Sequence, residues 1–257
     1  MRNKKFPGFY RRIDLCVFVV TAVILFSSVG CIRHTEVLME RLPVEKTKID
    51  FNNLIPESDS LNVIKDEYIY NGGGIGIGDF NGDNLQDIYF TGNVVANKLY
   101  LNKGDFEFED ITAIAGVAAE DIWSSGVSVI DINDDGRLDI YVCASFKKDP
   151  TSLKNKLFIN LGTRDGIPVF EDQAEMYGIA DDGHSTQGVF FDYDLDGDLD
   201  LYILTNVFIG SRSMTDEESI TKSWEPTIDK LYRNNGDHSF TNVSAEAGIT
   251  VAGFGLG

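Results

Sequence analysis

Short runs of alternating apolar and polar residues follow one another along residues 72–257, and the same runs recur three times in the same order. Such alternation is typical of β-strands with one buried face. The first two predicted strands of the repeats are residues 76–79 and 87–90, 126–130 and 138–142, and 188–191 and 199–203. A third strand with the pattern Lys-Leu-aromatic-x-Asn follows at 98–102, 156–160 and 230–234, and a fourth at 106–110, 169–172 and 239–242. Each repeat is therefore predicted to form four strands.

The repeats follow one another at similar intervals. Asp79, Asp131 and Asp192 occupy the same position in the three repeats and are 52 and 61 residues apart. Four strands per unit at this spacing match a β-propeller blade better than any helical repeat. We therefore predict an all-β fold of four-stranded antiparallel sheets, with blades at about 72–120, 121–182 and 183–252.

Three blades do not close a propeller, which typically has about four to eight. Residues 253–257 have the pattern of the opening strand of a fourth blade. We therefore expect this sequence to be the N-terminal part of a longer protein. The alternative is a complete three-repeat protein that dimerises or leaves its edge strands exposed.

The turn between the first and second strands of each repeat is an acidic loop of nine residues. Carboxylate or amide side chains at positions 1, 3 and 5 converge on one point, Gly or Asn at position 6 permits a sharp turn, and Asp at position 9 closes a shell of hard oxygen ligands that suits Ca²⁺. The predicted side-chain ligands are Asp79, Asn81, Asp83 and Asp87 in the first loop, Asp131, Asn133, Asp135 and Asp139 in the second, and Asp192, Asp194, Asp196 and Asp200 in the third.

Two other interpretations explain these loops less well. An EF-hand requires Glu at loop position 12, where the chain has Phe90, Val142 and Ile203. Asp, Asn and Gly also favour ordinary turns, but a turn does not need three or four acids, whose mutual repulsion a cation would relieve. We therefore expect about three Ca²⁺ ions, one for each loop, in a structural role.

The loop pattern, in register with the repeated strands, resembles the FG-GAP/VCBS repeat family, the integrin-α-like β-propellers, over roughly residues 72–257. Within that family the chain is similar to bacterial lipoproteins that pair such repeats with an ASPIC/UnbV segment. The resemblance implies that a backbone carbonyl at position 7 completes each calcium site, here on Leu85, Arg137 and Asp198. The first loop departs from the family pattern, because Asn84 replaces the turn glycine, but Asn tolerates the left-handed backbone that this turn needs.

The first thirty residues have the pattern of an export signal. A basic stretch precedes the apolar run Leu15–Phe26, which is too short to span a bilayer comfortably. The run ends at Ser28-Val-Gly-Cys31, which resembles a bacterial lipobox, so residues 1–30 are predicted to be a lipoprotein signal peptide and Cys31 the lipidation site. Its acyl chains would anchor the exported protein at the bacterial outer membrane or cell surface. Alternatively, an ordinary signal peptidase cleaves the same bond and leaves Cys31 as a free thiol.

Two stretches fall outside the repeated pattern. Residues 31–71 are mixed and polar and are predicted to be a tether between the anchor and the first blade. Residues 208–228 interrupt the third repeat, and Thr215-Asp-Glu-Glu218 predicts the start of a short helix that ends near Trp224. Cys143 has no partner left for a disulfide and is expected to be a small buried strand residue.

The chain is strongly acidic, with a formal net charge of −19 at pH 7. Removal of residues 1–30 would take away five basic residues and one acidic residue, which gives about −23, and three Ca²⁺ ions would bring this to about −17. Such a surface repels phosphate backbones, and no basic patch with interleaved aromatic residues is present in the sequence. We therefore expect no nucleic acid partner.

Patterns for catalysis are few. His34, His184 and His238 lack metal-ligand spacing to another His or Cys, which argues against a zinc site, and acids committed to calcium are poor general acids. The candidate ligand contacts are instead Trp123, which could stack on a sugar ring or pack between blades, and Trp224.

The sequence therefore predicts an exported, lipid-anchored, calcium-stabilised β-propeller that is not an enzyme. We expect it to act as a binding or adhesion scaffold for protein or glycan ligands on the bacterial cell envelope. One alternative is the propeller part of a carbohydrate-active enzyme, a lyase or hydrolase, whose catalytic residues lie beyond residue 257. Another is a purely structural spacer.

Overall fold

The computed structural model describes residues 39–65, 68–146, 153–206 and 228–250. The chain divides into two compact units, Met1–Leu42 and Pro43–Gly257, and all the described helices and strands lie in the second. Several predicted features lie outside the described residues: the signal peptide with Cys31, the helix that ends near Trp224, and the opening strand at residues 253–257. No helix among the described residues has the length and the apolar character needed to cross a membrane.

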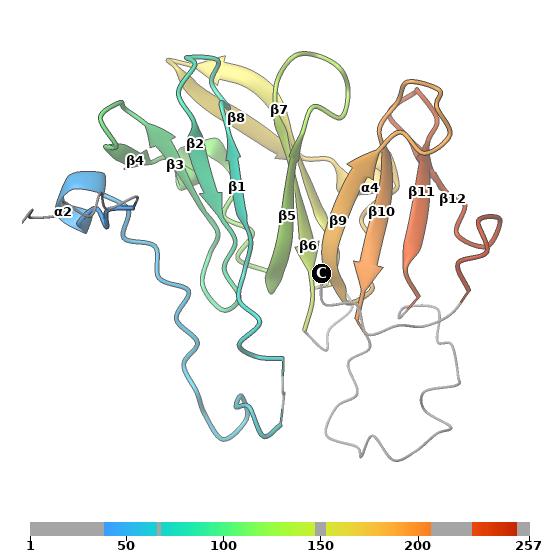
Figure 1. Cartoon of the computed structure of the whole chain (residues 1–257), viewed down its shortest axis with the longest axis horizontal. Helices are drawn as coiled ribbons and strands as arrows, with labels where there is room; N and C mark the ends of the chain where they lie inside the picture. Colours follow the sequence, from blue (N-terminus) through green and yellow to red (C-terminus); the bar gives the residue numbers. More distant parts are fainter. Residues whose placement is uncertain (1–38, 66–67, 147–152, 207–227, 251–257) are drawn as a thin grey trace, which may run out of the picture. The chain divides into compact units, whose positions relative to one another are not determined.

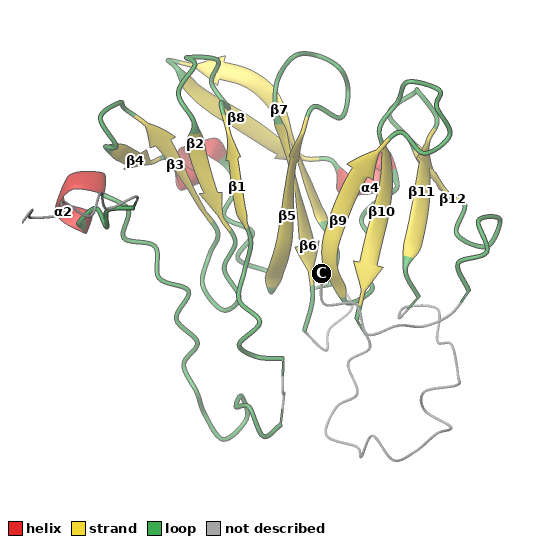
Figure 2. Ribbon diagram, viewed as in Figure 1, coloured by secondary structure: helices red, strands yellow, loops and turns green. Residues whose placement is uncertain are grey.

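The described residues of the second unit form three antiparallel sheets of four strands each, and within every sheet the strands follow chain order (Figures 1 and 2). The first sheet contains β1 (Ile75–Gly78), β2 (Asp87–Phe90), β3 (Lys98–Asn102) and β4 (Phe108–Asp110). The second contains β5 (Ser124–Ile130), β6 (Asp139–Ala144), β7 (Lys156–Arg164) and β8 (Ile167–Asp172). The third contains β9 (Ser185–Phe191), β10 (Asp200–Thr205), β11 (Lys230–Asn234) and β12 (Phe240–Asn242). This arrangement confirms the predicted all-β fold of propeller-like blades.

Three one-turn helices accompany the described strands: α2 (Val44–Thr47), α3 (Thr112–Ala115) and α4 (Ala174–Tyr177). The last two follow the fourth strands of the first and second sheets. Each ends at a glycine, Gly116 or Gly178, whose left-handed backbone caps the helix. The residues that follow the fourth strands of the first two sheets therefore turn back as short helices.

The second sheet is longer than the pattern predicted. β7 continues past Asn160 to Arg164, and β8 begins at Ile167, with an irregular register between Asn160 and Thr163. The connecting residues Asp165 and Gly166 both have positive φ, which is the backbone that a two-residue hairpin requires. In the first sheet the fourth strand is shorter than predicted, because Phe106 has positive φ and the strand begins only at Phe108.

The described residues form two apolar cores between neighbouring sheets, and β6 contributes to both. Successive side chains of a strand point to opposite faces. Ile140 and Val142 accordingly join the core shared with the first sheet, and Tyr141 and Cys143 join the core shared with the third. The thiol of Cys143 is free and buried, as predicted. Burial on both faces explains why this strand is apolar at nearly every position.

Buried tyrosines tie the second strand of the first and second sheets to the residues that follow α3 and α4. Tyr89 donates a hydrogen bond to the carbonyl of Val117 (2.7 Å), and Tyr141 donates one to the carbonyl of Ile179 (2.9 Å). Each hydroxyl also accepts a hydrogen bond from an Asn side chain just before the third strand, Asn97 in the first sheet and Asn155 in the second. In the third sheet Asp229 replaces this Asn, and Tyr202 donates to its carboxylate (2.9 Å).

The segment predicted as a tether contains residues that pack on the first sheet. The ring of Phe51 stacks on that of Phe90 with 5.0 Å between their centroids. Asp50 accepts a hydrogen bond of 2.7 Å from the hydroxyl of Tyr100. At least residues 50–51 of this segment are therefore part of the packed structure.

Candidate metal centre

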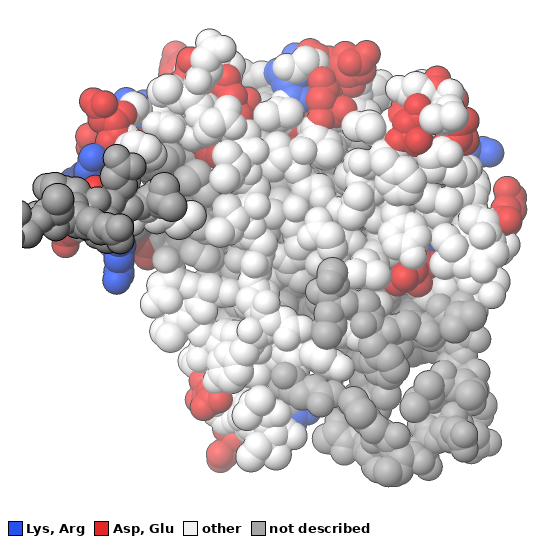
Figure 3. All heavy atoms as spheres, in the orientation of Figure 1, with Lys and Arg blue, Asp and Glu red and all other residues white. Residues whose placement is uncertain are grey.

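The three acidic loops connect β1 to β2, β5 to β6 and β9 to β10, and they lie at the same end of their sheets, at the top of Figure 1. In each case the strand ends are paired, as Gly78 with Asp87, Ile130 with Asp139 and Phe191 with Asp200. Position 9 of every loop is thus the first residue of a second strand. Figure 3 shows acidic side chains gathered along this end of the sheets.

The Asp at position 1 organises each loop. Asp79 Oδ1 accepts hydrogen bonds from the N–H groups of Gly82 (2.8 Å) and Asp83 (3.1 Å), and its Oδ2 accepts one from Asn84 N–H (2.7 Å). Such side-chain bonds to the following backbone are the basis of Asx turns. Equivalent bonds join Asp131 to the N–H groups of Asp135 and Gly136, and Asp192 to those of Asp196 and Gly197.

Position 6 has a left-handed backbone in all three loops, with φ of 68° at Asn84, 80° at Gly136 and 100° at Gly197. The Asn of the first loop thus adopts the conformation that glycine adopts in the other two. The sequence pattern missed a second left-handed position, position 4, because its residues, Gly82, Asp134 and Leu195, share no side-chain chemistry.

The Asp at position 9 is buried, with 0% of its surface exposed in all three loops. Each carboxylate accepts one backbone hydrogen bond from position 2 of its own loop and one from the Asn at the fifth residue of the third strand. The donors are the N–H groups of Phe80 and Asn102 to Asp87, Ile132 and Asn160 to Asp139, and Tyr193 and Asn234 to Asp200, at 2.7–3.1 Å.

The Asn of the third strand is itself held in place. In the first sheet, Asn102 Oδ1 accepts a hydrogen bond from Gly104 N–H (2.9 Å), and its Nδ2 donates to the carbonyl of Gln86 at position 8 of the loop (2.9 Å). Asn160 and Asn234 make the equivalent bonds in the other sheets. The repeated Asn therefore supports the loop, a role that the strand pattern alone did not reveal.

Burial is costly for the ionised form of the position-9 carboxylate in the first and second loops. Removal from water raises the pKa of Asp87 and that of Asp139 to about 6, although two backbone hydrogen bonds to each act in the opposite direction. The carboxylates at positions 5 and 1 raise the pKa further by repulsion. A cation bound at the loop would offset both effects.

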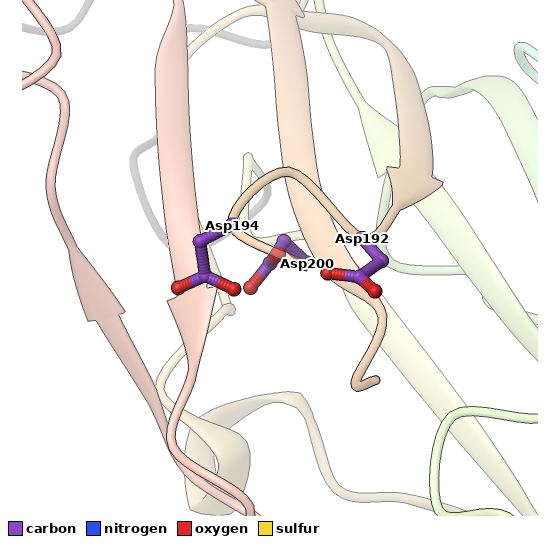
Figure 4. A group of neighbouring side chains, drawn as sticks. All are labelled: Asp192, Asp194 and Asp200. Atoms are coloured by element: carbon purple, nitrogen blue, oxygen red, sulfur yellow. The ribbon is translucent and has the colours of Figure 1, made fainter. Parts of the chain in front are cut away.

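In the third loop, Asp192, Asp194 and Asp200 form a group that could hold a metal ion. One carboxylate oxygen of each residue lies within 4.8 Å of the others, and Figure 4 shows the three carboxylates side by side across the turn. Repulsion from neighbouring carboxylates adds to desolvation in raising the pKa of Asp194. A set of oxygen donors only, in a small loop, fits a hard divalent cation such as Ca²⁺.

The first and second loops have a different arrangement at position 3. The amide Nδ2 of Asn81 donates to Asp83 Oδ2, and that of Asn133 donates to Asp135 Oδ2, each at 3.0 Å. Asp135 also forms an ion pair with Arg137. The amide oxygens of both Asn residues accept hydrogen bonds from the backbone two residues later (3.2 Å each).

In each loop the side chain at position 5 accepts a hydrogen bond from the backbone of position 7. Asp83, Asp135 and Asp196 accept hydrogen bonds of 2.8–3.0 Å from the N–H groups of Leu85, Arg137 and Asp198. These bonds close the turn just before position 9. Coordination by the carbonyl groups of Leu85, Arg137 and Asp198 stays a prediction.

The tryptophans are not part of these loops. Trp123 precedes β5, at the opposite end of the strand from the second loop, and only 7% of its surface is exposed. Its ring packs on that of Phe146, with centroids 4.3 Å apart. Trp224 lies outside the described residues.

Comparison with known proteins agrees with the repeated pattern. A model of the FG-GAP-like repeat matches residues 79–142, a range that begins at Asp79, includes the first and second loops and ends in β6. Human cartilage acidic protein 1 is 25% identical over 186 residues, an alignment that covers 52% of this chain and 28% of the human protein. The chain thus contains an FG-GAP-like repeat, is distantly similar to the human protein, and spans little more than a quarter of its length.

Proposed function

We propose that this chain is part of an exported, lipid-anchored β-propeller in which three Ca²⁺ ions stabilise the blades and the blades bind a protein or glycan ligand without catalysis. The observation that carries this proposal is the triple occurrence of one loop, each with a buried Asp at position 9 that is held from both sides by backbone N–H groups. The ligand would be bound on the bacterial cell envelope.

Ca²⁺ is the cation that this set of donors favours. The side chains that would hold it are those at positions 1, 3, 5 and 9, with the carbonyl of position 7, and all of them offer oxygen. The FG-GAP-like match includes two of the loops, and repeats of that kind often bind Ca²⁺. The ion would supply positive charge to a crowded set of carboxylates, and it would take part in no reaction.

A structural role for the ions follows from where the loops are attached. Each loop joins the first two strands of a sheet and is bonded to the third strand through its Asn. For a site of about 0.1 mM affinity in about 1 mM Ca²⁺, mass action contributes roughly 1.4 kcal/mol. Three such sites approach the stability of a typical domain, about 5–15 kcal/mol.

The proposed export and lipid anchor rest on the N-terminal sequence. The basic stretch, the short apolar run and the small residues before Cys31 support cleavage at that residue and acylation of its thiol. An acidic exported protein held at a membrane by its N-terminus would present its blades to ligands outside the cell.

The surroundings of Ser185 support a role without catalysis. This serine follows His184, so the pair invites comparison with a nucleophile and its base. Ser185 is fully buried, and its hydroxyl accepts a hydrogen bond from Asn155 Nδ2 (3.0 Å). A nucleophile must instead be accessible to substrate and activated by a base.

The proposal can be tested with the purified full chain in buffers with Ca²⁺ or with a chelator. Binding to a glycan array and capture of envelope proteins should both be assayed, and at least one should give Ca²⁺-dependent binding. The bound glycans should be recovered intact. Cleaved glycans would favour a carbohydrate-active enzyme, and the absence of any binding would favour a structural spacer.

A further inference from the structure

A cavity of about 400 Å³ lies at the end of the sheets opposite the acidic loops. Its wall is built from residues just before or at the start of β1, β5 and β9 and from residues that follow β6 and β10. The acidic loops come after β1, β5 and β9, so the cavity and the candidate metal centres occupy opposite ends of the same strands. Cavities of roughly 300–1,000 Å³ are typical of sites for small ligands.

The cavity has buried polar atoms that lack partners. Asn206 is 1% exposed, and neither its Nδ2 nor its Oδ1 forms a hydrogen bond. Ser145 is 4% exposed, and its hydroxyl also lacks a partner. Both residues line the cavity. Because buried polar groups in folded proteins are nearly always hydrogen-bonded, an amide and a hydroxyl left without partners at one cavity indicate a ligand that both donates and accepts.

The rest of the wall limits the class of ligand. Among the described residues that line the cavity, none is charged, although the chain as a whole carries a formal charge of −19. The rings of Trp123 and Phe146 form an aromatic part of the wall, and Phe146 has a left-handed backbone with φ of 66° that a bulky residue rarely adopts. Strained backbone of this kind is concentrated at functional sites.

A neutral sugar matches these features. Its hydroxyl groups both donate and accept hydrogen bonds, and its C–H faces pack on aromatic rings. An anionic sugar would find no cationic partner among the described lining residues, and desolvating its charge would be unfavourable. A purely apolar ligand would leave Asn206 and Ser145 unpaired.

We infer that this cavity binds a neutral sugar unit of a glycan, with the amide of Asn206 and the hydroxyl of Ser145 bonded to the sugar hydroxyls and with Trp123 and Phe146 as its apolar wall. The inference rests on the proposed binding function and deepens it, because it assigns both a site and a ligand class. It leaves the acidic loops with a structural role only.

The test uses the full chain in Ca²⁺ and a panel of neutral monosaccharides: glucose, galactose, mannose, fucose and N-acetylglucosamine. Binding is screened by saturation-transfer NMR and measured by calorimetry. At least one sugar should bind, and Asn206→Ala and Ser145→Ala should each weaken its affinity by about tenfold or more, which corresponds to roughly 1.4 kcal/mol. The control Asn235→Ala, at an exposed Asn after β11, should leave the affinity unchanged.

Ser145→Ala separates a ligand contact from a structural role. The substitution deletes a buried hydroxyl that has no partner, so the melting temperature of the free chain should stay the same or rise while sugar affinity falls. A lower melting temperature with unchanged affinity would contradict the inference.

Other outcomes distinguish the site from the wider proposal. If a neutral sugar binds equally well to both variants, the cavity is not the site, although the binding function stands. If none of the five sugars binds, or glucuronate binds better than glucose, the inference is overturned. If the full chain binds neither glycans nor envelope proteins, the proposed function itself is wrong.

Discussion

Replacement of Asp200 by Asn removes one charge from the third loop and hardly changes the size of the side chain. Asp200 is fully buried, and its two oxygens accept hydrogen bonds from the N–H groups of Tyr193 (2.9 Å) and Asn234 (2.8 Å). An Asn side chain has one oxygen and one NH₂ group, which cannot accept. In Asp200→Asn one of the two backbone N–H groups therefore faces another donor.

The loss of stability in Asp200→Asn should have two parts, which can be measured separately. Without Ca²⁺, a hydrogen bond to a charged group is lost, which costs about 1.5–3 kcal/mol. For a domain of this size, a change of that magnitude lowers the melting temperature by about 3–12 °C. With Ca²⁺ at about ten times the dissociation constant, the wild-type site gains roughly a further 1.4 kcal/mol that the variant should not gain.

The assay is thermal unfolding of wild type and variant in chelator and in saturating Ca²⁺. Asp198→Asn is the matched control, because position 7 is predicted to contribute its backbone carbonyl and not its side chain. This control should keep the full Ca²⁺-induced rise in melting temperature. If Asp200→Asn shows the same Ca²⁺-induced rise as wild type, Asp200 is not a ligand and the reasoning is wrong.

Three further predictions concern pH, packing and the anchor. The Ca²⁺ affinity of the first two loops, measured by calorimetry, should fall as the pH is lowered towards 6, because burial raises the pKa of Asp87 and of Asp139 to about 6 and protons then compete with the ion. In chelator, lower pH should instead stabilise the chain, because the folded chain binds these protons more tightly than the unfolded chain does. The free energy of unfolding should therefore rise as the pH falls from about 7 to about 4. A decrease across this range would contradict the assignment. Tyr141→Phe should cost about 1–3 kcal/mol in urea unfolding, because Asn155 loses an acceptor in a buried site. Cys31→Ala should abolish acyl labelling, and labelling that persists would move the anchor elsewhere.

Much of the fold could be predicted because its information is local. The alternation of residues 87–90 and their counterparts predicts strands without knowledge of distant contacts. The spacing of acids within the loops likewise predicts which side chains share a turn, and the structure places Asp192, Asp194 and Asp200 together as one group. The match to an FG-GAP-like repeat begins at the first of these loops.

Other features depend on contacts between residues far apart in the chain. Phe51 stacks on Phe90, so a segment whose composition predicts a tether packs in part on the first sheet. The cavity combines Trp123, which precedes β5, with Ser145 and Asn206, which follow β6 and β10, and the three residues share no motif. Left-handed backbone at position 4 of the third loop falls on Leu195, a residue type that does not predict it.

The central claim is that three equivalent loops hold Ca²⁺ and thereby stabilise the sheets. Calorimetric titration of Ca²⁺ into the metal-free full chain, with melting temperatures measured before and after saturation, tests it most directly. The account predicts three bound ions per chain and a higher melting temperature in the loaded state. No saturable binding, or binding that leaves the melting temperature unchanged, would contradict it.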